Sequence, residues 1–225
     1  MTKSANKKYK NFSCAEINLN EKKPCAMLST ATMARPTLSS IEEAVKSHIG
    51  EPLHCPITAN KGAAGLLLEK LTGIPTSSAL LDALDGEVKI VPYKRLKNGS
   101  LVPKETIAVT MLNCDQLCST NFTDSHCAAK LRRMLIVPYI REGDNIRLLK
   151  PTLFDASASC NEELFAVLAA DYAAIQSEWL SKKELHSETG ALLQTRTKGP
   201  GGTAKKTRAF YLRPAFMKKV VSLDP

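Results

Sequence analysis

An Asn-Gly pair between two strand-like segments constrains the fold of this chain more than any other feature. Asn98-Gly99 separates KRLK from SLV, and this dipeptide is the strongest short signal for a β-hairpin. The segment before it has a period of two, so Val88 and Ile90 point one way while Glu87 and Lys89 point the other. We therefore expect a hairpin in the middle of the chain whose first strand carries a glutamate and a lysine on one face.

Further strands and helices are expected on both sides of this hairpin. ETIAVTML and RMLIVPYI predict strands over 105–112 and 133–140, the second apolar enough to be central. Helices are expected after a cap at Ser39 or Ser40, up to a glycine cap at Gly73, and from about 162 to 182 after Ser159 or Asn161. A short strand and a terminal helix follow the basic Gly/Pro-rich loop near the C-terminus. This succession predicts a mixed α/β domain.

Composition limits the class of protein. The 225 residues are 44% hydrophobic, which is enough to bury a core. The sequence has no run of 18 apolar residues and no hydrophobic segment behind its first lysines, so we expect a soluble, cytoplasmic protein without a membrane span. Residues 1–38 read as a flexible basic N-terminal arm, and 39–225 as one domain. A net charge of +9 favours an anionic partner, above all nucleic acid.

Seven cysteines indicate reduced thiols rather than a disulfide framework in such a protein. Cys114 and Cys118, with His126 and Cys127 further on, suggest a zinc site at first sight. Their spacing matches no standard zinc pattern, so we interpret them as buried or incidental thiols.

The acidic groups before and within the first hairpin strand could support metal-dependent phosphodiester cleavage. Asp82 and Glu87 offer oxygen ligands to a hard cation such as Mg²⁺. Lys89 lies on the same strand face as Glu87, where it could orient or deprotonate a water that attacks a phosphate. The same three residues could equally be the charged outer face of an ordinary hairpin, and the triplet alone does not decide between the two.

Several blocks of sequence, in order, resemble a known family of nucleases. The blocks are GAAGLLLEKLTG, Asp82, GEVKIVPYKRLKNG, SHCAAKLRRMLIVP, GALLQTRTKG and RAFYLRPAF. They are similar to MutH, the mismatch-repair nicking endonuclease, and to the related GATC-cutting restriction endonucleases of the PD-(D/E)XK superfamily. The resemblance runs from about Asn60 to Val220. It implies a restriction-endonuclease-like mixed β-sheet flanked by helices, with a DNA-binding cleft and Mg²⁺ as the cofactor.

The resemblance also implies roles for individual residues. Glu87 would be a metal ligand and Lys89 would lie next to the attacking water. Glu69 would help to bind the metal, and Lys130 would be a further active-site lysine near the scissile phosphate. The metal ligands would thus be Asp82, Glu87 and Glu69.

DNA contacts are implied mainly near the C-terminus, where no acid occurs between Glu188 and Asp224. The expected DNA-binding residues are Lys61, Arg196, Lys198, Lys205, Lys206 and Tyr211. Arg196 is the candidate base reader, because an arginine can bind guanine O6 and N7 together. The Gly/Pro-rich stretch 198–206 could alternatively be a solvated loop without a function.

Two departures from the family pattern concern the site. The family aspartate lies seven residues before the glutamate, whereas position 80 is leucine here and Asp82 is only five residues before Glu87. Asp85 is the alternative acid, although its place in the turn predicts a side chain directed into solvent. On the strand 105–112, Ile107 stands where the family has an aromatic residue that reads DNA.

The sequence thus predicts a Mg²⁺-dependent type II restriction endonuclease that recognises GATC or a close variant in double-stranded DNA. It would act as a monomer or as a dimer formed on DNA, in a system with a cognate adenine methyltransferase. A MutH-type methyl-directed nicking enzyme of mismatch repair, and a DNA-binding relative whose active site has decayed, are the alternatives.

Overall fold

The computed structural model describes residues 35–57, 62–198 and 207–223. The predicted arm therefore lies almost wholly outside the described residues, as do Lys61, Lys205 and Lys206. Within the described residues, no helix is both long and apolar enough to cross a membrane.

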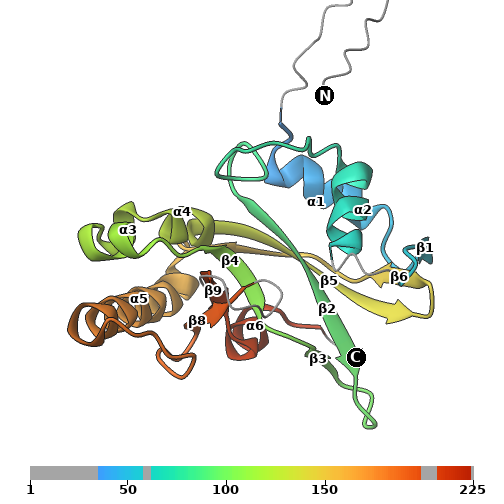
Figure 1. Ribbon diagram of the computed structural model, residues 1–225. Helices are drawn as coiled ribbons and strands as arrows, with labels where there is room; N and C mark the ends of the chain where they lie inside the picture. The colour runs from blue at the N-terminus through green and yellow to red at the C-terminus, as the bar shows by residue number, and fades with distance from the viewer. Residues whose placement is uncertain (1–34, 58–61, 199–206, 224–225) are drawn as a thin grey trace, which may run out of the picture. The chain divides into compact units, whose positions relative to one another are not determined.

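Helices and groups of consecutive strands follow one another along the described chain (Figure 1). In chain order they are α1 (Leu38–Lys46), β1 (Leu53–His54), α2 (Ala63–Thr72), β2 (Glu87–Arg95), β3 (Leu101–Pro103), β4 (Ile107–Met111), α3 (Cys114–Ser119), η1 (Phe122–Asp124), α4 (His126–Arg132), β5 (Arg133–Glu142), β6 (Asn145–Leu148), β7 (Thr152–Asp155), η2 (Ser159–Asn161), α5 (Glu162–Lys182), β8 (Leu193–Thr197), β9 (Arg208–Leu212) and α6 (Pro214–Val220).

A mixed sheet forms the centre of this unit. Its strand order is β1-β6-β5-β2-β3, and β7 also pairs with β5. β2 and β5 run parallel, from Glu87 opposite Met134 to Tyr93 opposite Ile140, whereas all other pairs in the sheet are antiparallel. A second, antiparallel sheet has the order β4-β9-β8. The predicted mixed α/β fold, with a mixed sheet flanked by helices, is confirmed.

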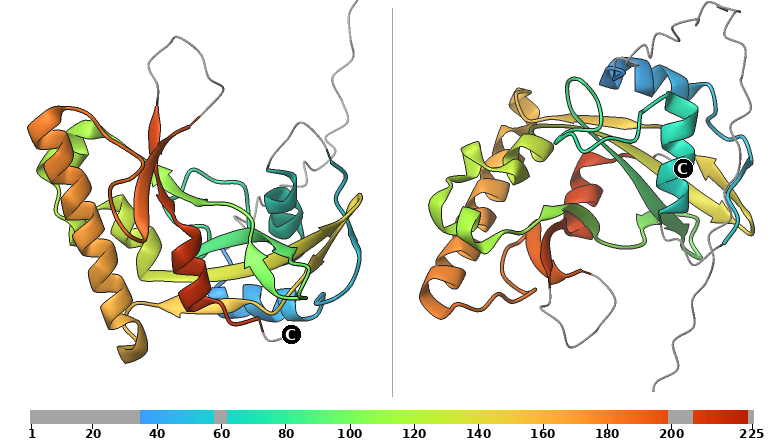
Figure 2. Two further views of the ribbon diagram at one scale, coloured as in Figure 1. Left: turned by 90° about the horizontal axis from the view of Figure 1, so that it is seen from below. Right: turned by 45° about the horizontal axis from the view of Figure 1, so that its top comes forward.

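Two hydrophobic clusters cover the two faces of the central strands. Val88 packs with α1 and α2 on one face, and Val91 packs on the other face with α4, α5, α6 and the second sheet. Figures 1 and 2 show α1 and α2, in blue and teal, across β2 and β5 from α5 and α6, in orange and red. Strand alternation places Glu87 and Lys89 on the same face as Val91, as the period of two predicts.

The hairpin and the end of α2 form as predicted. Arg95 pairs with Leu101 across the turn, and Gly99 takes a φ of +87°, which favours glycine. Gly73 ends α2 in the left-handed conformation with a φ of +72°, and its N–H donates to the carbonyl of Glu69.

The predicted start of the first helix is wrong. The N-cap is Thr37, whose side-chain oxygen accepts a hydrogen bond from the N–H of Ser40 at 3.2 Å, so the helix begins at Leu38. Leu38 is 1% exposed and belongs to the core under α1. Ser40 thus takes part in the cap as its donor, because the chain enters the helix earlier than the apolar pattern indicates.

The long helix α5 agrees with its predicted face. Leu168, Tyr172 and Ile175 are buried, and Leu164 and Trp179 pack against the same cluster. Asn161 is its N-cap residue, but the Asn161 side chain donates to the carbonyl of Asp155 at 2.9 Å instead of capping the helix.

Candidate active site

The predicted pair of Glu87 and Lys89 lies where β2 begins beside β5. Glu87 and Lys89 project toward α4, the short helix that leads directly into β5. The Ser125 hydroxyl caps this helix by accepting a hydrogen bond from the N–H of Ala128 at 3.0 Å. Because β5 is the parallel neighbour of β2, its preceding helix carries Lys130 to the start of β2, 43 residues along the chain from Glu87.

Glu87 holds both lysines. Its carboxylate is 1% exposed, and the Lys130 Nζ donates to Oε1 and to Oε2 at 2.8 Å each. The Lys89 Nζ also donates to Oε1. The lysine side chains are only 20% and 15% exposed for Lys89 and Lys130, so two cations and one anion share a largely desolvated site. Such charge-assisted hydrogen bonds are about twice as strong as neutral ones, and here they fix both ammonium groups in place.

Asp82 reaches the start of the same strand from the preceding loop. Its Oδ2 accepts a hydrogen bond from the N–H of Val88 at 3.2 Å. Because Val88 directly follows Glu87, this bond places the Asp82 carboxylate beside the first residues of β2. Among the described residues, no hydrogen bond is made to the other Asp82 oxygen, so that oxygen is available to a ligand.

Asp85 has a different role, and its predicted direction into solvent is wrong. Its Oδ1 accepts the N–H of Leu38 at 2.7 Å, and its Oδ2 pairs with Arg133 at the start of β5. The loop is tied further to the segment before α1, because Arg35 donates to the carbonyl of Leu81 at 3.0 Å. Asp85 therefore fastens the loop that carries Asp82.

Gly86 permits the close approach of this loop to β5. A Cβ at this position would lie 2.6 Å from the carbonyl oxygen of Arg133 and would also meet the Leu38 side chain. Backbone atoms cannot yield to such a contact as a flexible side chain can. Glycine immediately before Glu87 is thus a packing requirement of the site.

Glu69 lies on α2, which packs against the other face of the central sheet. Its neighbour Leu68 belongs to the cluster that contains Val88 and Leu135, whereas Glu87 projects from the opposite face. Among the described residues, no hydrogen bond or ion pair joins the Glu69 side chain to Asp82, Glu87 or either lysine. Its role as a metal ligand stays a prediction.

Two side chains of the site carry the kind of ligand that a hard divalent cation prefers. Asp82 and Glu87 supply carboxylate oxygens, which Mg²⁺ prefers. No group of three or more metal-binding side chains is assembled within the described ranges. Glu87 directs both of its oxygens to Lys130, so a cation would have to compete with an ammonium group for this carboxylate. Any other ligands of such a cation would have to come from water or substrate.

The residues expected to read DNA lie on the second sheet. Arg196 on β8 is exposed, its Nη1 donates to the Thr106 hydroxyl at 2.8 Å, and its guanidinium lies 5.9 Å from the ring centroid of Tyr211 on β9. Lys198 is exposed at the end of β8. Ile107 is buried in the core, so it presents no surface to a ligand.

Sequence reasoning missed Gln194. It precedes Arg196 by two residues on β8, is 4% exposed, and lines an open cavity of about 420 Å³ together with Arg196 and Arg213. The sequence analysis predicts no strand over 193–197, where alternation puts Gln194 on the same face as Arg196. That alternation in LLQTRT was the available signal.

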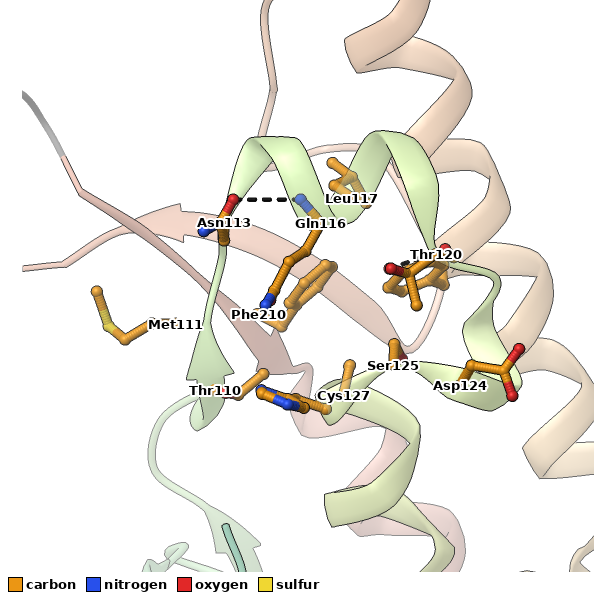
Figure 3. Close-up of a pocket in the computed structure, with 12 residues that line it drawn as sticks. Thr110, Met111, Asn113, Gln116, Leu117, Thr120, Asp124, Ser125, Cys127 and Phe210 are labelled. Atoms are coloured by element: carbon orange, nitrogen blue, oxygen red, sulfur yellow. Dashed lines mark hydrogen bonds between the residues drawn. The ribbon is translucent and has the colours of Figure 1, made fainter. Parts of the chain in front are cut away.

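Within the described residues, the cysteines and the histidine of 114–127 do not come together as a group of metal-binding side chains. Cys114 and Cys118 lie on α3. Cys127 lies in the first turn of α4 and lines, with His126, a cavity of about 80 Å³ between these helices and β4 (Figure 3). Burial raises the pKa of the Cys127 and Cys114 thiols, which disfavours the thiolates that zinc needs. Every cysteine in the described part of the chain is a free thiol, as interpreted from the sequence.

One family model matches part of the chain. Residues 76–171 match the family model described as the DNA mismatch repair enzyme MutH. The matched range contains Asp82, Glu87, Lys89 and Lys130, but neither Glu69 nor the strands β8 and β9. The resemblance to the MutH family is confirmed over these residues.

Among solved structures, the chain is similar to the restriction endonuclease MvaI, solved with its cognate DNA substrate. The TM-score is 0.40 and the identity 11%, over 81% of this chain and 95% of that chain. No curated protein gives a significant match.

Proposed function

We propose that this chain, which is MutH-like over residues 76–171, is a Mg²⁺-dependent endonuclease that hydrolyses phosphodiester bonds in double-stranded DNA at GATC or a close variant. The observation that carries this proposal is the buried Glu87 carboxylate held by Lys89 and Lys130, with Asp82 at the same end of β2. A hairpin with an outward charged face would leave Glu87 in solvent, and here it is 1% exposed.

Charge supports a phosphate substrate. The carboxylates of Asp82 and Glu87 balance the ammonium groups of Lys89 and Lys130, so the site is neutral before a cation binds. Mg²⁺, held by the two carboxylates, would stabilise the charge that develops on the scissile phosphate. The site would then favour the approach of an anion such as the DNA backbone.

Each lysine would have a separate task. Lys89 follows the metal-binding glutamate on the same strand face, where its ammonium group would orient the attacking water. Lys130 comes from α4 and would stabilise the negative phosphate oxygens. Because Glu87 already fixes both ammonium groups, neither lysine has to be ordered when the substrate binds.

The basic C-terminal segment would supply the backbone contacts. Arg196 and Lys198 are exposed on β8 or just after it. Contacts to roughly six to ten phosphates reduce binding on the order of a thousandfold or more between 50 and 200 mM salt, so we expect a steep salt dependence. Arg196 would add sequence discrimination at a guanine.

A nicking activity in mismatch repair is the second candidate, favoured by the description of the matching family. If the chain is instead a type II restriction enzyme, two copies would act on the palindromic site and a cognate adenine methyltransferase would protect host DNA. Unaided double-strand cleavage of a plasmid carrying one GATC site supports restriction, and slow nicking that depends on a repair partner supports the second candidate.

The proposal is tested with purified protein, Mg²⁺ and plasmid DNA. Wild type should cut, and Lys89→Ala should abolish cutting while gel-shift binding is retained. Lys94→Ala is the matched control, because Lys94 is an exposed lysine on the same strand. An inactive wild type that still binds DNA would instead identify the decayed relative.

A further inference from the structure

The exposed end of the second sheet forms a surface with several hydrogen-bonding groups on one face. Gln194 and Arg196 are two residues apart on β8 and therefore point to the same side. Tyr211 lies directly opposite Gln194 in the β8–β9 register and shares that side. The other side, with Leu193 and Phe210, is buried in the core. One face of this sheet thus supports the fold, and on the other face Gln194 and Arg196 line one open cavity.

Gln194 is nearly buried as a residue, but its amide is not one of the fully enclosed polar atoms that lack a partner, so the amide keeps contact with the adjoining cavity. The residue is 4% exposed, and no described residue donates to or accepts from its side chain. A buried amide normally finds hydrogen bonds within the protein, since leaving them unmade is costly. Gln194 lines the cavity of about 420 Å³ that it shares with Arg196 and Arg213, so its missing partner can enter from that cavity.

The strand that carries Gln194 is held rigidly. Asp171 of α5, itself 7% exposed, accepts the N–H groups of Ala191, Leu192 and Leu193 at 2.7, 2.7 and 2.8 Å. These three bonds fix the entry of β8 immediately before Gln194. A side chain on a strand fixed in this way can present its amide to a ligand with little loss of conformational entropy.

The chemistry of the amide indicates the ligand. A glutamine side chain both donates and accepts, which matches adenine, whose major-groove edge offers the N6 amino group and the N7 acceptor. The neighbouring Arg196 matches guanine, and a two-stranded β-ribbon fits the major groove of DNA. Alternate residues on a strand are separated by about 6.6–6.8 Å, which corresponds to two base steps of about 3.4 Å.

We propose that Gln194 is a second base-reading residue, which recognises an adenine of the target sequence through N6 and N7. This inference rests on the proposed DNA endonuclease function and deepens it. Arg196 would then read the guanine, and Gln194 would read the adenine of the complementary strand in the base pair two steps away in GATC.

The test combines one variant with one modified base. In the site that wild type cuts, GATC in the first instance, each adenine is replaced by 7-deazaadenine, which lacks the N7 acceptor. Wild type should lose about tenfold or more in relative cleavage rate and in binding at the adenine that Gln194 contacts. Gln194→Met, which keeps the side-chain length, should be weakened on natural DNA but indifferent to this replacement.

Two controls exclude a loss of folding. The circular dichroism spectrum and urea midpoint of Gln194→Met should be close to those of wild type. Gln116→Met, an exposed glutamine on α3, should keep the full penalty for 7-deazaadenine.

The outcomes separate this inference from the proposed function. If wild type cuts its site selectively but Gln194→Met suffers the same 7-deazaadenine penalty, the adenine contact is refuted and the endonuclease stands. A target sequence without adenine also refutes the contact. If wild type neither cuts nor prefers any sequence, the proposed function fails and this inference fails with it.

Discussion

Replacing Glu87 with glutamine tests whether this carboxylate holds two cations together inside the protein. Glu87 is 1% exposed, and Lys89 and Lys130 both donate to its Oε1. Two ammonium groups on one oxygen lie within about 5–6 Å of each other, since each is one hydrogen-bond length from it. At that separation and an effective dielectric constant of 20, their repulsion is about 3 kcal/mol. Glu87→Gln keeps the shape of the side chain but removes the charge that offsets this repulsion.

We therefore expect Glu87→Gln to lower the free energy of unfolding by about 3–5 kcal/mol, as when one partner of a buried pair is removed. Adding Lys130→Met should recover about 3 kcal/mol of this loss, because only one cation then remains. Lys130→Met alone should cost less than Glu87→Gln, since Glu87 keeps Lys89 as its partner. The double variant thus separates repulsion from simple loss of packing.

The assay is urea unfolding without divalent cations, followed by fluorescence of Trp179, the only tryptophan in the sequence, and by circular dichroism. Glu105→Gln removes an exposed carboxylate and should change the free energy of unfolding by no more than about 0.5 kcal/mol. The reasoning is refuted if the free energy of unfolding of Glu87→Gln is within about 1 kcal/mol of wild type, because ordinary surface substitutions change it by up to about 0.5 kcal/mol. It is also refuted if the double variant is no more stable than Glu87→Gln.

Two further predictions concern the loop before the site and the approach to β8. Gly86→Ala should lower the free energy of unfolding by about 1–3 kcal/mol and abolish cleavage, because the Cβ of the alanine would lie 2.6 Å from the Arg133 carbonyl oxygen. Gly65→Ala, in open space on α2, should not lower the free energy of unfolding in the same urea titration. Burial raises the pKa of Glu178, but hydrogen bonds, above all from His186, lower it to about 2 from an ordinary 4.5. A depressed pKa contributes stability above pH 4.5 that is lost as the pH falls toward 2. Glu178→Gln should therefore lower the urea midpoint at pH 7 and have little effect on it near pH 2. An equal change of the urea midpoint at the two pH values would contradict this.

The strands and the shared face of Glu87 and Lys89 were predictable because their signals are local. A period of two fixed the shared face of Glu87 and Lys89, and Asn98-Gly99 fixed the hairpin. The place of Lys130 came only from the family resemblance. Its position depends on the parallel pairing of β2 with β5, which is a long-range contact that no local pattern encodes.

The supports of β8 were not predictable for a related reason. Asp171 looks like one more polar residue on a helix, yet it accepts three backbone N–H groups from the start of β8. Backbone donors are present at every residue except proline, so the sequence does not mark which of them a buried carboxylate will meet. Gln194 was overlooked with that strand, since its burial follows from where β8 is held.

Asp82 and Asp85 show most clearly what the fold decides. Both are acids in one short turn before the same strand, and local pattern gives neither a reason to bind a metal rather than the protein. The structure separates them: Asp85 directs one oxygen to the N–H of Leu38 and the other to Arg133, so its carboxylate is fully used in fastening the loop. Asp82 uses one oxygen on the N–H of Val88 and keeps the other for a ligand. The acid five residues before Glu87 is therefore the one that can serve the site, and the nearer acid is what holds it there.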